Sequence, residues 1–264
     1  MNRTVLAATL LATTSVANAS ILLFVIDGLG NFDPIPQDYG DRVTATTIGI
    51  YHYGIGTEGP TPNIIATYPT AGGVDPSHWG TGYGDLRDVY FDDADGVGHG
   101  EVILSADYGY EVVLYSFEMA AYSSVFSSDP TIDAVRVMGC SPGALFEQTN
   151  AVISETTHTT FDFTSSPLQD REIRIQFESG NLAGLSDDIA LDTIRFGQVE
   201  VAADEMTCPS DIAVRLCVLD VFDVFGYLDL FAAGDELADF TFDGTLDIFD
   251  VFAFLDEFNA GCGE

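Results

Sequence analysis

Lysine is absent from this sequence. The eight basic residues are all arginines, set against 42 aspartates and glutamates, so the formal net charge is −34. A chain of this charge repels phosphate backbones and anionic lipid, so we expect no nucleic-acid partner and no binding to an anionic membrane surface. Because 47% of the residues are hydrophobic, the charge does not indicate a disordered acidic tail, and we expect folded domains with a solvated acidic surface.

Long apolar runs are also missing, apart from a short one at the start. Arg3 precedes the apolar stretch 5–16, and residues 17–19 form a small-x-small cleavage pattern before Ser20. This predicts an export signal over residues 1–19, although a buried first strand or helix would also explain the stretch. No later segment approaches the roughly 20 apolar residues of a membrane span. We therefore expect a secreted or cell-surface protein whose mature chain has no membrane span.

Cysteine is scarce, with four in the chain, which is enough for two disulfides in an exported protein. Cys208 and Cys262 bracket the C-terminal segment, and a bond between them would staple a module too small to be secure alone. Three connectivities are possible, and spacing favours only this bracketing bond. Cys140 and Cys217 stay unassigned. No Cys-x-x-Cys or Cys/His cluster indicates zinc or a redox dithiol.

The region from residue 20 to about 200 is typical of a β protein. Short β-type segments alternate with clusters of Gly, Pro, Asp and Ser, and no helical periodicity occurs before residue 219. Nine or so antiparallel strands in this length predict a β-sandwich, of jelly-roll type. The candidate strands are 21–26, 43–50, 86–91, 101–106, 111–118, 132–137, 159–163, 172–177 and 189–196.

Four phrases of this region resemble the exported β-sandwich domains of bacterial PEP-CTERM proteins, which are similar to galactose-binding-like jelly rolls. The phrases are GYGDL at 82–86, GYEVVLYSFEMAAY at 109–122, HTTFDFT at 158–164 and LDTIRFGQV at 191–199.

The resemblance implies a calcium site in the sandwich, and the C-terminal segment departs from the PEP-CTERM pattern. In galactose-binding-like sandwiches an acid on the first strand and one on the last often share a structural calcium, which implies Asp27 and Asp192 here. Strand-end acids facing solvent are the alternative. PEP-CTERM proteins usually end in a membrane-spanning sorting segment, and this chain does not.

Aromatic residues beside small and polar ones suggest a sugar-binding surface. Sugars stack on flat rings and hydrogen-bond to neighbouring polar groups, so loops carrying such residues suit glycan capture. Packing of the rings against the edge of the sandwich is the alternative. The candidates are Trp79, which is the only tryptophan, with His78, Tyr83, Tyr51 and Tyr53.

The C-terminal tail contains a duplication. Residues 219–234 read LDVFDVFGYLDLFAAG and residues 246–261 read LDIFDVFAFLDEFNAG, with eleven of sixteen positions identical. A repeat this clear predicts a two-unit module whose halves bury their apolar faces against each other.

The second copy begins with a twelve-residue calcium-loop pattern. Gly244 stands at the sharp turn of position 6, and a short helix is expected after the loop. The oxygen ligands at positions 1, 3, 5, 7, 9 and 12 would be Asp239, Thr241, Asp243, the Thr245 carbonyl, Asp247 and Asp250.

The first copy of the loop is degenerate. Asp220 and Asp223 match the last two ligands, but Val214, Leu216 and Cys217 replace two ligands and the turn glycine. Asp211 is the nearest upstream acid, one residue out of register. We expect this loop to bind calcium weakly or not at all.

Residues 208–264 resemble the GC-type dockerin anchoring domains of exported bacterial proteins. Dockerins pair with cohesins through loop positions 10 and 11, which are Val221-Phe222 and Ile248-Phe249 here. These pairs are apolar rather than the Ser/Thr of cellulosomal dockerins. The resemblance implies calcium as the cofactor and a cohesin-like or other surface protein as the partner, while packing of the two halves on each other would explain part of the apolar surface.

Taken together, the sequence predicts an export signal at 1–19, a β-sandwich domain at 20–200, a linker at 201–207 and a dockerin-like module at 208–264. The expected function is non-catalytic, as an adhesion or polysaccharide-binding domain displayed through its tail. One alternative is a polysaccharide-degrading hydrolase or lyase, for which no acid/base pair can be singled out among so many acids. A structural component of a surface layer is the other.

Overall fold

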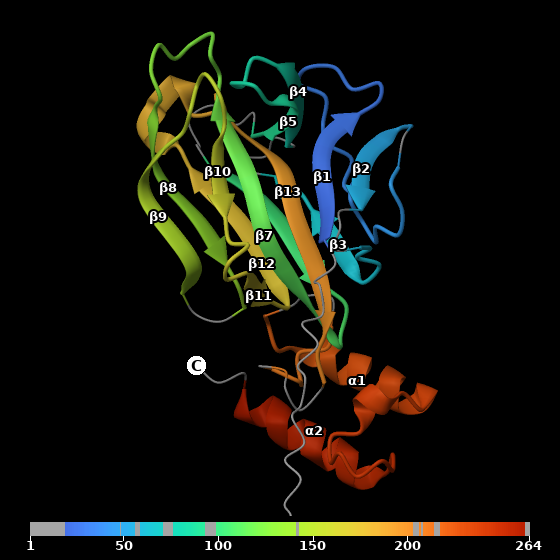
Figure 1. Cartoon of the computed structure of the whole chain (residues 1–264). Helices are drawn as coiled ribbons and strands as arrows, with labels where there is room; N and C mark the ends of the chain where they lie inside the picture. The colour runs from blue at the N-terminus through green and yellow to red at the C-terminus, as the bar shows by residue number, and fades with distance from the viewer. Residues whose placement is uncertain are drawn as a thin grey trace, which may run out of the picture.

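The computed structural model describes residues 19–47, 49–55, 59–70, 76–92, 99–140, 143–202, 206, 208–213 and 217–261. Two antiparallel β-sheets stack on each other, and two helices lie beyond one end of the stack (Figure 1). The predicted β-sandwich is therefore confirmed at this level.

Eight strands form the first sheet, with the order β10-β7-β13-β1-β2 and with β11, β5 and β4 attached beside this path. Its strands are β1 (Ala19–Ile26), β2 (Tyr51–Ile55), β4 (Ser77–Thr81), β5 (Arg87–Phe91), β7 (Tyr110–Ala121), β10 (Thr159–Asp162), β11 (Leu168–Asp170) and β13 (Ile189–Glu200). The second sheet has the order β3-β6-β12-β8-β9. Its strands are β3 (Ile64–Thr67), β6 (His99–Ala106), β8 (Thr131–Met138), β9 (Ala144–Val152) and β12 (Glu172–Glu178).

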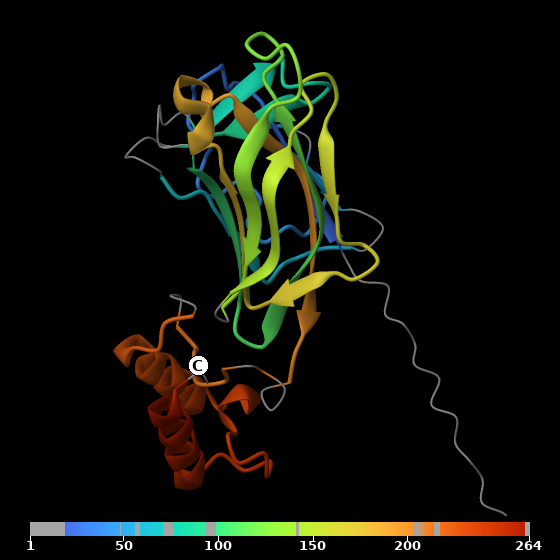
Figure 2. The same cartoon turned by 90° about the vertical axis from the view of Figure 1, so that its left-hand side faces the viewer.

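The main core fills the space between the two sheets, which Figure 2 shows from the side. Successive side chains of a strand point to opposite faces of the sheet, so alternation decides which of them enter the core. Ile173, Ile175 and Phe177 of β12 alternate with polar residues and are buried. In β6 every second residue is likewise buried. The core is thus built by the alternation visible in the sequence.

A smaller apolar cluster lies under β4 and β5, on a separate patch of the first sheet. Tyr83, Phe91 and Ala190 are buried there, with Trp79 packed against them. The turn between β4 and β5 needs a glycine at Gly84, because its φ is +53° and a Cβ there would lie 1.7 Å from the Thr157 carbonyl oxygen.

Several strand predictions were wrong or missing. Residues 43–50 form no strand, and among their described residues only isolated bridges at Val43 and Thr47 occur. Five strands were not predicted: β2, β3, β4, β9 and β11. The clearest case is β9, an edge strand whose side chains are mostly exposed, so no apolar alternation marks it in the sequence.

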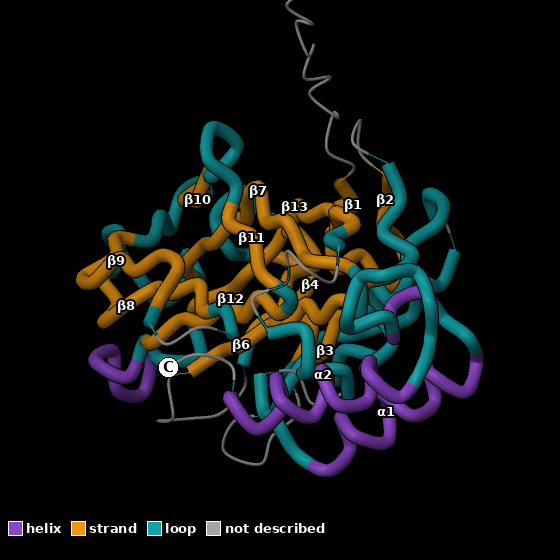
Figure 3. Tube along the Cα trace, turned by 90° about the horizontal axis from the view of Figure 1, so that it is seen from below, coloured by secondary structure: helices purple, strands orange, loops and turns teal. Residues whose placement is uncertain are grey.

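The two helices of the tail are α1 (Val221–Ala233) and α2 (Ile248–Ala260), and they lie side by side when the molecule is seen from below (Figure 3). Each helix begins at a capping box, in which an aspartate at the cap and another three residues later bond each other's backbone N–H. The rings of Tyr227 and Phe254 are fully buried and stack with centroids 4.1 Å apart.

Two short 3₁₀ helices complete the described elements, η1 (Gly180–Leu185) and η3 (Glu236–Ala238). Residues 1–18, which carry nearly all of the predicted export signal, lie outside the described residues. None of the helices described is long and apolar enough to cross a membrane.

Candidate functional site

The predicted calcium loop, residues 239–250, connects η3 to α2 and is tied together by its own carboxylates. Asp239 accepts a hydrogen bond from the backbone N–H of Gly244 at 2.7 Å. Asp243 accepts one from Thr245 N–H at 2.8 Å. Gly244 has a φ of +80°, the left-handed conformation that the sharp turn of such a loop requires.

Asp250 closes the loop from its far end. This fully buried carboxylate accepts hydrogen bonds from Thr241 N–H at 3.0 Å, Thr241 Oγ1 at 2.8 Å and Asp247 N–H at 2.7 Å. Burial acts to raise the pKa of Asp250, but these hydrogen bonds outweigh it and lower the pKa below its ordinary value. Asp250 is therefore held as an anion inside the loop.

The donor set of this loop suits a hard cation. Thr241 Oγ1 contacts both Asp239 and Asp250, at 3.3 and 2.8 Å, so the first and last ligand positions meet around one side chain. Carboxylate, hydroxyl and carbonyl oxygens are the ligands that calcium takes in loops of this length. In the part of the chain that the structure describes, no three acidic, histidine or cysteine side chains converge closely enough to hold an ion as they stand.

The first loop repeats this pattern with Asp211 in the place of Asp239. Asp211 Oδ2 accepts a hydrogen bond from Cys217 N–H at 2.6 Å, as Asp239 does from Gly244. Cys217 also shares the positive φ, at 66°. The first loop is thus one residue longer than the second, which explains why Asp211 stands one residue out of register.

The remaining acids of the first loop act as hydrogen-bond acceptors. Asp223 accepts bonds from Ile212 N–H at 2.8 Å and Ala213 N–H at 2.7 Å, and Asp220 N–H donates to it at 2.7 Å. Asp220 in turn accepts from Phe222 N–H at 2.8 Å. Both acids therefore hold the loop to α1 in the way that Asp250 and Asp247 hold the second loop to α2.

Large apolar side chains stand exposed at matching positions of the two helices. Phe222 is 58% exposed and its counterpart Phe249 64%, while Phe225 is 56% exposed and its counterpart Phe252 55%. Val221 and Ile248 are exposed in the same way. We call these six residues the apolar face. Packing of the two halves on each other does not cover it, because that packing uses Tyr227, Phe254 and their neighbours.

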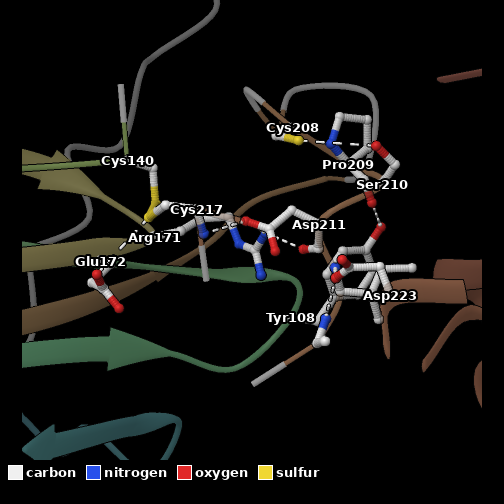
Figure 4. Close-up of polar contacts among 12 residues, drawn as sticks. Tyr108, Cys140, Arg171, Glu172, Cys208, Pro209, Ser210, Asp211, Cys217 and Asp223 are labelled. Atoms are coloured by element: carbon white, nitrogen blue, oxygen red, sulfur yellow. Dashed lines mark hydrogen bonds and ion pairs between the residues drawn. A yellow bond between two sulfur atoms is a disulfide. The ribbon is translucent and has the colours of Figure 1, made fainter. Parts of the chain in front are cut away.

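The two cysteines that spacing left unassigned are bonded to each other. Cys140, after β8, forms a disulfide with Cys217 in the first loop, so a covalent bond ties the tail to the sandwich (Figure 4). Cys208 is also disulfide-bonded. Cys262, its predicted partner, lies outside the described residues.

Four of the five proposed sugar-binding residues lie in strands, and Tyr83 lies between β4 and β5. Tyr51 and Tyr53 belong to β2, and His78 and Trp79 belong to β4. Tyr83 is buried. The prediction that they lie in loops was wrong for the four strand residues, and sugar binding at these positions stays a prediction.

Packing accounts for most contacts of these rings. Trp79 meets Phe32 edge-on at 4.8 Å between centroids and donates a hydrogen bond from Nε1 to the Thr81 carbonyl at 2.7 Å. His78 is buried, with Nδ1 3.1 Å from the Gly30 carbonyl and Nε2 3.2 Å from Asp88. Trp79 and His78 are therefore held in place by neighbouring rings, backbone carbonyls and Asp88.

Asp27 and Asp192 have separate surroundings. Asp27 is exposed and lies 3.1 Å from His52 Nε2. Asp192 is buried on β13 opposite Glu118 of β7. Burial raises the pKa of Asp192 well above its ordinary value, and the nearby charges of Glu118 and Asp88 add to the effect. Among the described contacts nothing links the two aspartates as ligands of a common ion.

No known protein family and no curated protein matches the chain. Among solved structures, an apo cyclase from Fischerella sp. has a TM-score of 0.35 and 14% identity, covering 69% of this chain and 98% of that one. A GH29 fucosidase from Ruminococcus gnavus scores 0.30 at 12% identity, covering 55% of this chain and 26% of its own. The family 32 carbohydrate-binding module of C. perfringens NanJ, solved with galactose, scores 0.26 at 15% identity, covering 52% and 93%. Likenesses this distant carry no argument about ligand or activity.

Sequence reasoning missed three features of the tail. Phe225 and Phe252 extend the apolar face by one helical turn beyond the predicted positions, a spacing that the repeat itself contains. The insertion that makes Asp211 a ligand-position residue could be found by allowing a gap between the copies. The role of Arg171, which contacts Asp211 from the sandwich, has no signal in the sequence.

Proposed function

We propose that this chain is an exported, non-catalytic protein that is held at the cell surface through its tail and displays its β-sandwich outward. The tail is a dockerin-like module, residues 208–264, and the sandwich, residues 20–200, is of jelly-roll type. The apolar face is the surface through which the tail binds a partner protein.

One observation carries the proposal, namely the exposure of Phe222, Phe225, Phe249 and Phe252 at equivalent positions of α1 and α2. Single exposed apolar side chains are common on folded proteins, but four phenylalanines repeated at equivalent positions of two helices are typical of a binding surface. The capping boxes and the buried Tyr227–Phe254 stack hold the two helices together, so with calcium in the second loop little order has to be created on binding.

The charge of the tail defines the partner. Residues 203–264 hold fifteen acidic residues and one arginine, so a partner needs an apolar patch surrounded by Arg or Lys side chains. A cohesin-like surface protein with such a patch is the partner we propose. A second copy of the same chain would bring two equally acidic surfaces together, which like-charge repulsion opposes.

Calcium is the proposed cofactor of the second loop. Asp239, Thr241, Asp243, Asp247 and Asp250 with the Thr245 carbonyl would hold the ion, whose charge offsets the repulsion among four carboxylates in twelve residues. In this role the ion fixes the start of α2, and with it Phe249 and Phe252.

The sandwich is proposed to bind a polysaccharide or another surface ligand. Trp79 is the residue of its aromatic cluster that stays partly exposed on β4, and its ring edge is the contact we would assign. Two alternatives are a polysaccharide-degrading hydrolase or lyase and a structural component of a surface layer. A glycan array followed by a reducing-end assay would separate these two from a binding domain.

The docking proposal is tested with the mature chain and envelope fractions of its source cells. Wild type should sediment with the envelopes in calcium, and a variant with Phe222, Phe225, Phe249 and Phe252 all changed to Ser should stay in the supernatant. The matched control changes Ile50 and Val152, which are exposed apolar residues of the sandwich, to Ser and should still sediment.

Two results would overturn the docking proposal. In one, the fourfold Ser variant sediments as well as wild type. In the other, analytical ultracentrifugation shows a wild-type dimer that the Ser variant does not form, which would assign the apolar face to a second copy of the chain.

A further inference from the structure

Arg171 reaches from the sandwich into the first loop of the tail. It lies between β11 and β12, and its Nη1 donates a hydrogen bond to the Asp211 backbone carbonyl (Figure 4). The same nitrogen lies 3.4 Å from Asp211 Oδ2, with the Arg171 side chain 3% and the Asp211 side chain 1% exposed. The planar guanidinium thus presents its N–H donors to Asp211 from a buried position.

The contacts around Arg171 form a closed ring through both parts of the chain. Asp170 Oδ1 accepts the Arg171 N–H at 2.7 Å, and its Oδ2 accepts the Cys140 N–H at 3.1 Å. Cys140 is bonded to Cys217, whose N–H donates to Asp211 Oδ2 at 2.6 Å. Asp211 and Arg171 complete the ring, so the position of the guanidinium is fixed from two directions.

Tyr108 fixes the other side of the arginine. Its ring lies under the guanidinium at 5.5 Å from the centroid, and its hydroxyl donates to the Pro209 carbonyl at 2.7 Å. Cation–π contact and hydrogen bond together hold the backbone that enters the loop.

The guanidinium lies beside the acid at the first ligand position of the first loop. Asp211 takes the first ligand position and Asp223 the last, as Asp239 and Asp250 do in the second loop. Arg171 therefore pairs with an acid of the first loop. The second loop has four carboxylates, and among the described residues none of these four forms an ion pair with an arginine.

From this contrast we infer that Arg171 is a permanent substitute for calcium in the first loop. The chain then takes a single calcium ion, in the second loop. The half of the apolar face on α1 is held in place with or without calcium, whereas the half on α2 depends on the ion. This last consequence rests on the proposed docking function, but the substitution itself does not.

Within the part of the chain that the structure describes, three polar atoms of the Arg171–Asp211 pair are not satisfied by hydrogen bonds. Arg171 Nε and Nη2 and Asp211 Oδ1 are buried and have no hydrogen-bond partner among the described residues. Removing the guanidinium would leave Asp211 as a buried, uncompensated charge, which is strongly unfavourable. The first loop should then loosen, or take calcium in place of the lost cation.

The first experiment counts calcium ions bound to the full mature chain by native mass spectrometry and titration calorimetry. Wild type should bind one ion, Asp211→Ala should still bind one, and Asp239→Ala should bind none. Two ions on wild type, or loss of the ion in Asp211→Ala with retention in Asp239→Ala, would overturn the inference.

The second experiment follows hydrogen exchange at the amides of Ala213 and Cys217, which donate to the acids of the first loop. In wild type their protection should be the same in calcium and in chelator, while that of Thr241 and Gly244 should rise with calcium. Calcium-dependent protection of Ala213 and Cys217 in wild type would contradict the substitution.

Variants of the arginine complete the test. In Arg171→Met the Ala213 and Cys217 amides should exchange roughly tenfold faster or more in chelator, and millimolar calcium should restore part of the protection. Arg171→Lys keeps a cation and should lie between. The matched control is Arg136→Met, which removes an arginine of β8 paired with Glu147 and Glu178 and should leave these amides unchanged. Unchanged exchange in a folded Arg171→Met chain would refute the role of the guanidinium. If that variant does not fold, the ion count on wild type decides alone.

Both experiments are independent of envelope binding. The substitution of Arg171 for calcium can therefore be refuted while the docking proposal holds, and the docking proposal can be refuted while the substitution holds.

Discussion

Asp250 and Asp223 form a natural matched pair for testing how the two loops differ. Both are fully buried, both stand three residues after a helix cap, and each accepts three hydrogen bonds from its own loop. Replacement of either by Ala removes the same kind of contact. Any difference between the two variants must come from what the loop binds in addition.

The expected magnitudes follow from these contacts. Three donors lose a charged acceptor in each variant, and because such contributions do not add fully, the unfolding free energy of the tail should fall by about 3 kcal/mol in chelator. At a free calcium concentration a hundredfold above the dissociation constant, the ion stabilises the wild-type tail by about 3 kcal/mol more. Asp250→Ala should lose this increment as well, for a total of about 6 kcal/mol. Asp223→Ala should cost the same with and without calcium.

Urea unfolding followed by far-ultraviolet circular dichroism measures both values, because α1 and α2 are the two α-helices of the described chain. Each variant is unfolded in calcium and in chelator, with wild type beside it. If calcium stabilises Asp250→Ala as strongly as wild type, the second loop does not bind the ion through this carboxylate. If Asp223→Ala and Asp250→Ala respond to calcium equally, the reasoning that separates the two loops is wrong.

Three further results are expected. Burial raises the pKa of Asp211 to about 6 despite the attraction of Arg171. Since the folded pKa exceeds the unfolded one, the folded chain binds this proton more tightly, and its contribution of about 3 kcal/mol to the unfolding free energy should be lost as the pH rises from about 4 to 6. Asp211→Asn should remove this slope in urea titrations across that range, and a slope that persists in the Asn variant would contradict it. Changing Cys140 and Cys217 to Ser opens a ring spanning 77 residues, so the urea midpoint should fall by the equivalent of about 4 kcal/mol, and an unchanged midpoint would show that the bond does not form in solution. Trp79→Ala should lower the unfolding free energy of the sandwich by about 3 kcal/mol, because the ring fills part of a buried cluster; a fully stable variant that has lost retention on a polysaccharide column would instead identify Trp79 as a ligand contact.

The strands that could be predicted from the sequence are those in which every second side chain is apolar and enters the core. Ile173, Ile175 and Phe177 specify β12 and its orientation, because a shift by one residue would place all three on the wrong face. β9 shows the opposite case. It pairs with one neighbour and exposes most of its side chains, so its backbone hydrogen bonds to β8 define it and its residue types do not.

The candidate site was predictable wherever the repeat could be compared with itself. The second loop, its turn glycine and the helix after it follow from spacing within twelve residues. Arg171 could not be found in this way. It lies 40 residues before Asp211 in the sequence and meets it only because the tail packs against the end of the sandwich beside β11.

The disulfide between Cys140 and Cys217 also determines how the chain transmits force. When its two ends are pulled, tension passes from β8 through the sulfur atoms directly into the first loop and α1. Strands β9 to β13 lie within the bypassed segment, so the covalent path of the tension does not run through them. The 77 residues spanned by the bond would extend by roughly 260 Å if they were released, so the bond withholds that length from any stretching of the protein. In the proposed surface attachment, this length would become available under shear only after the disulfide is reduced.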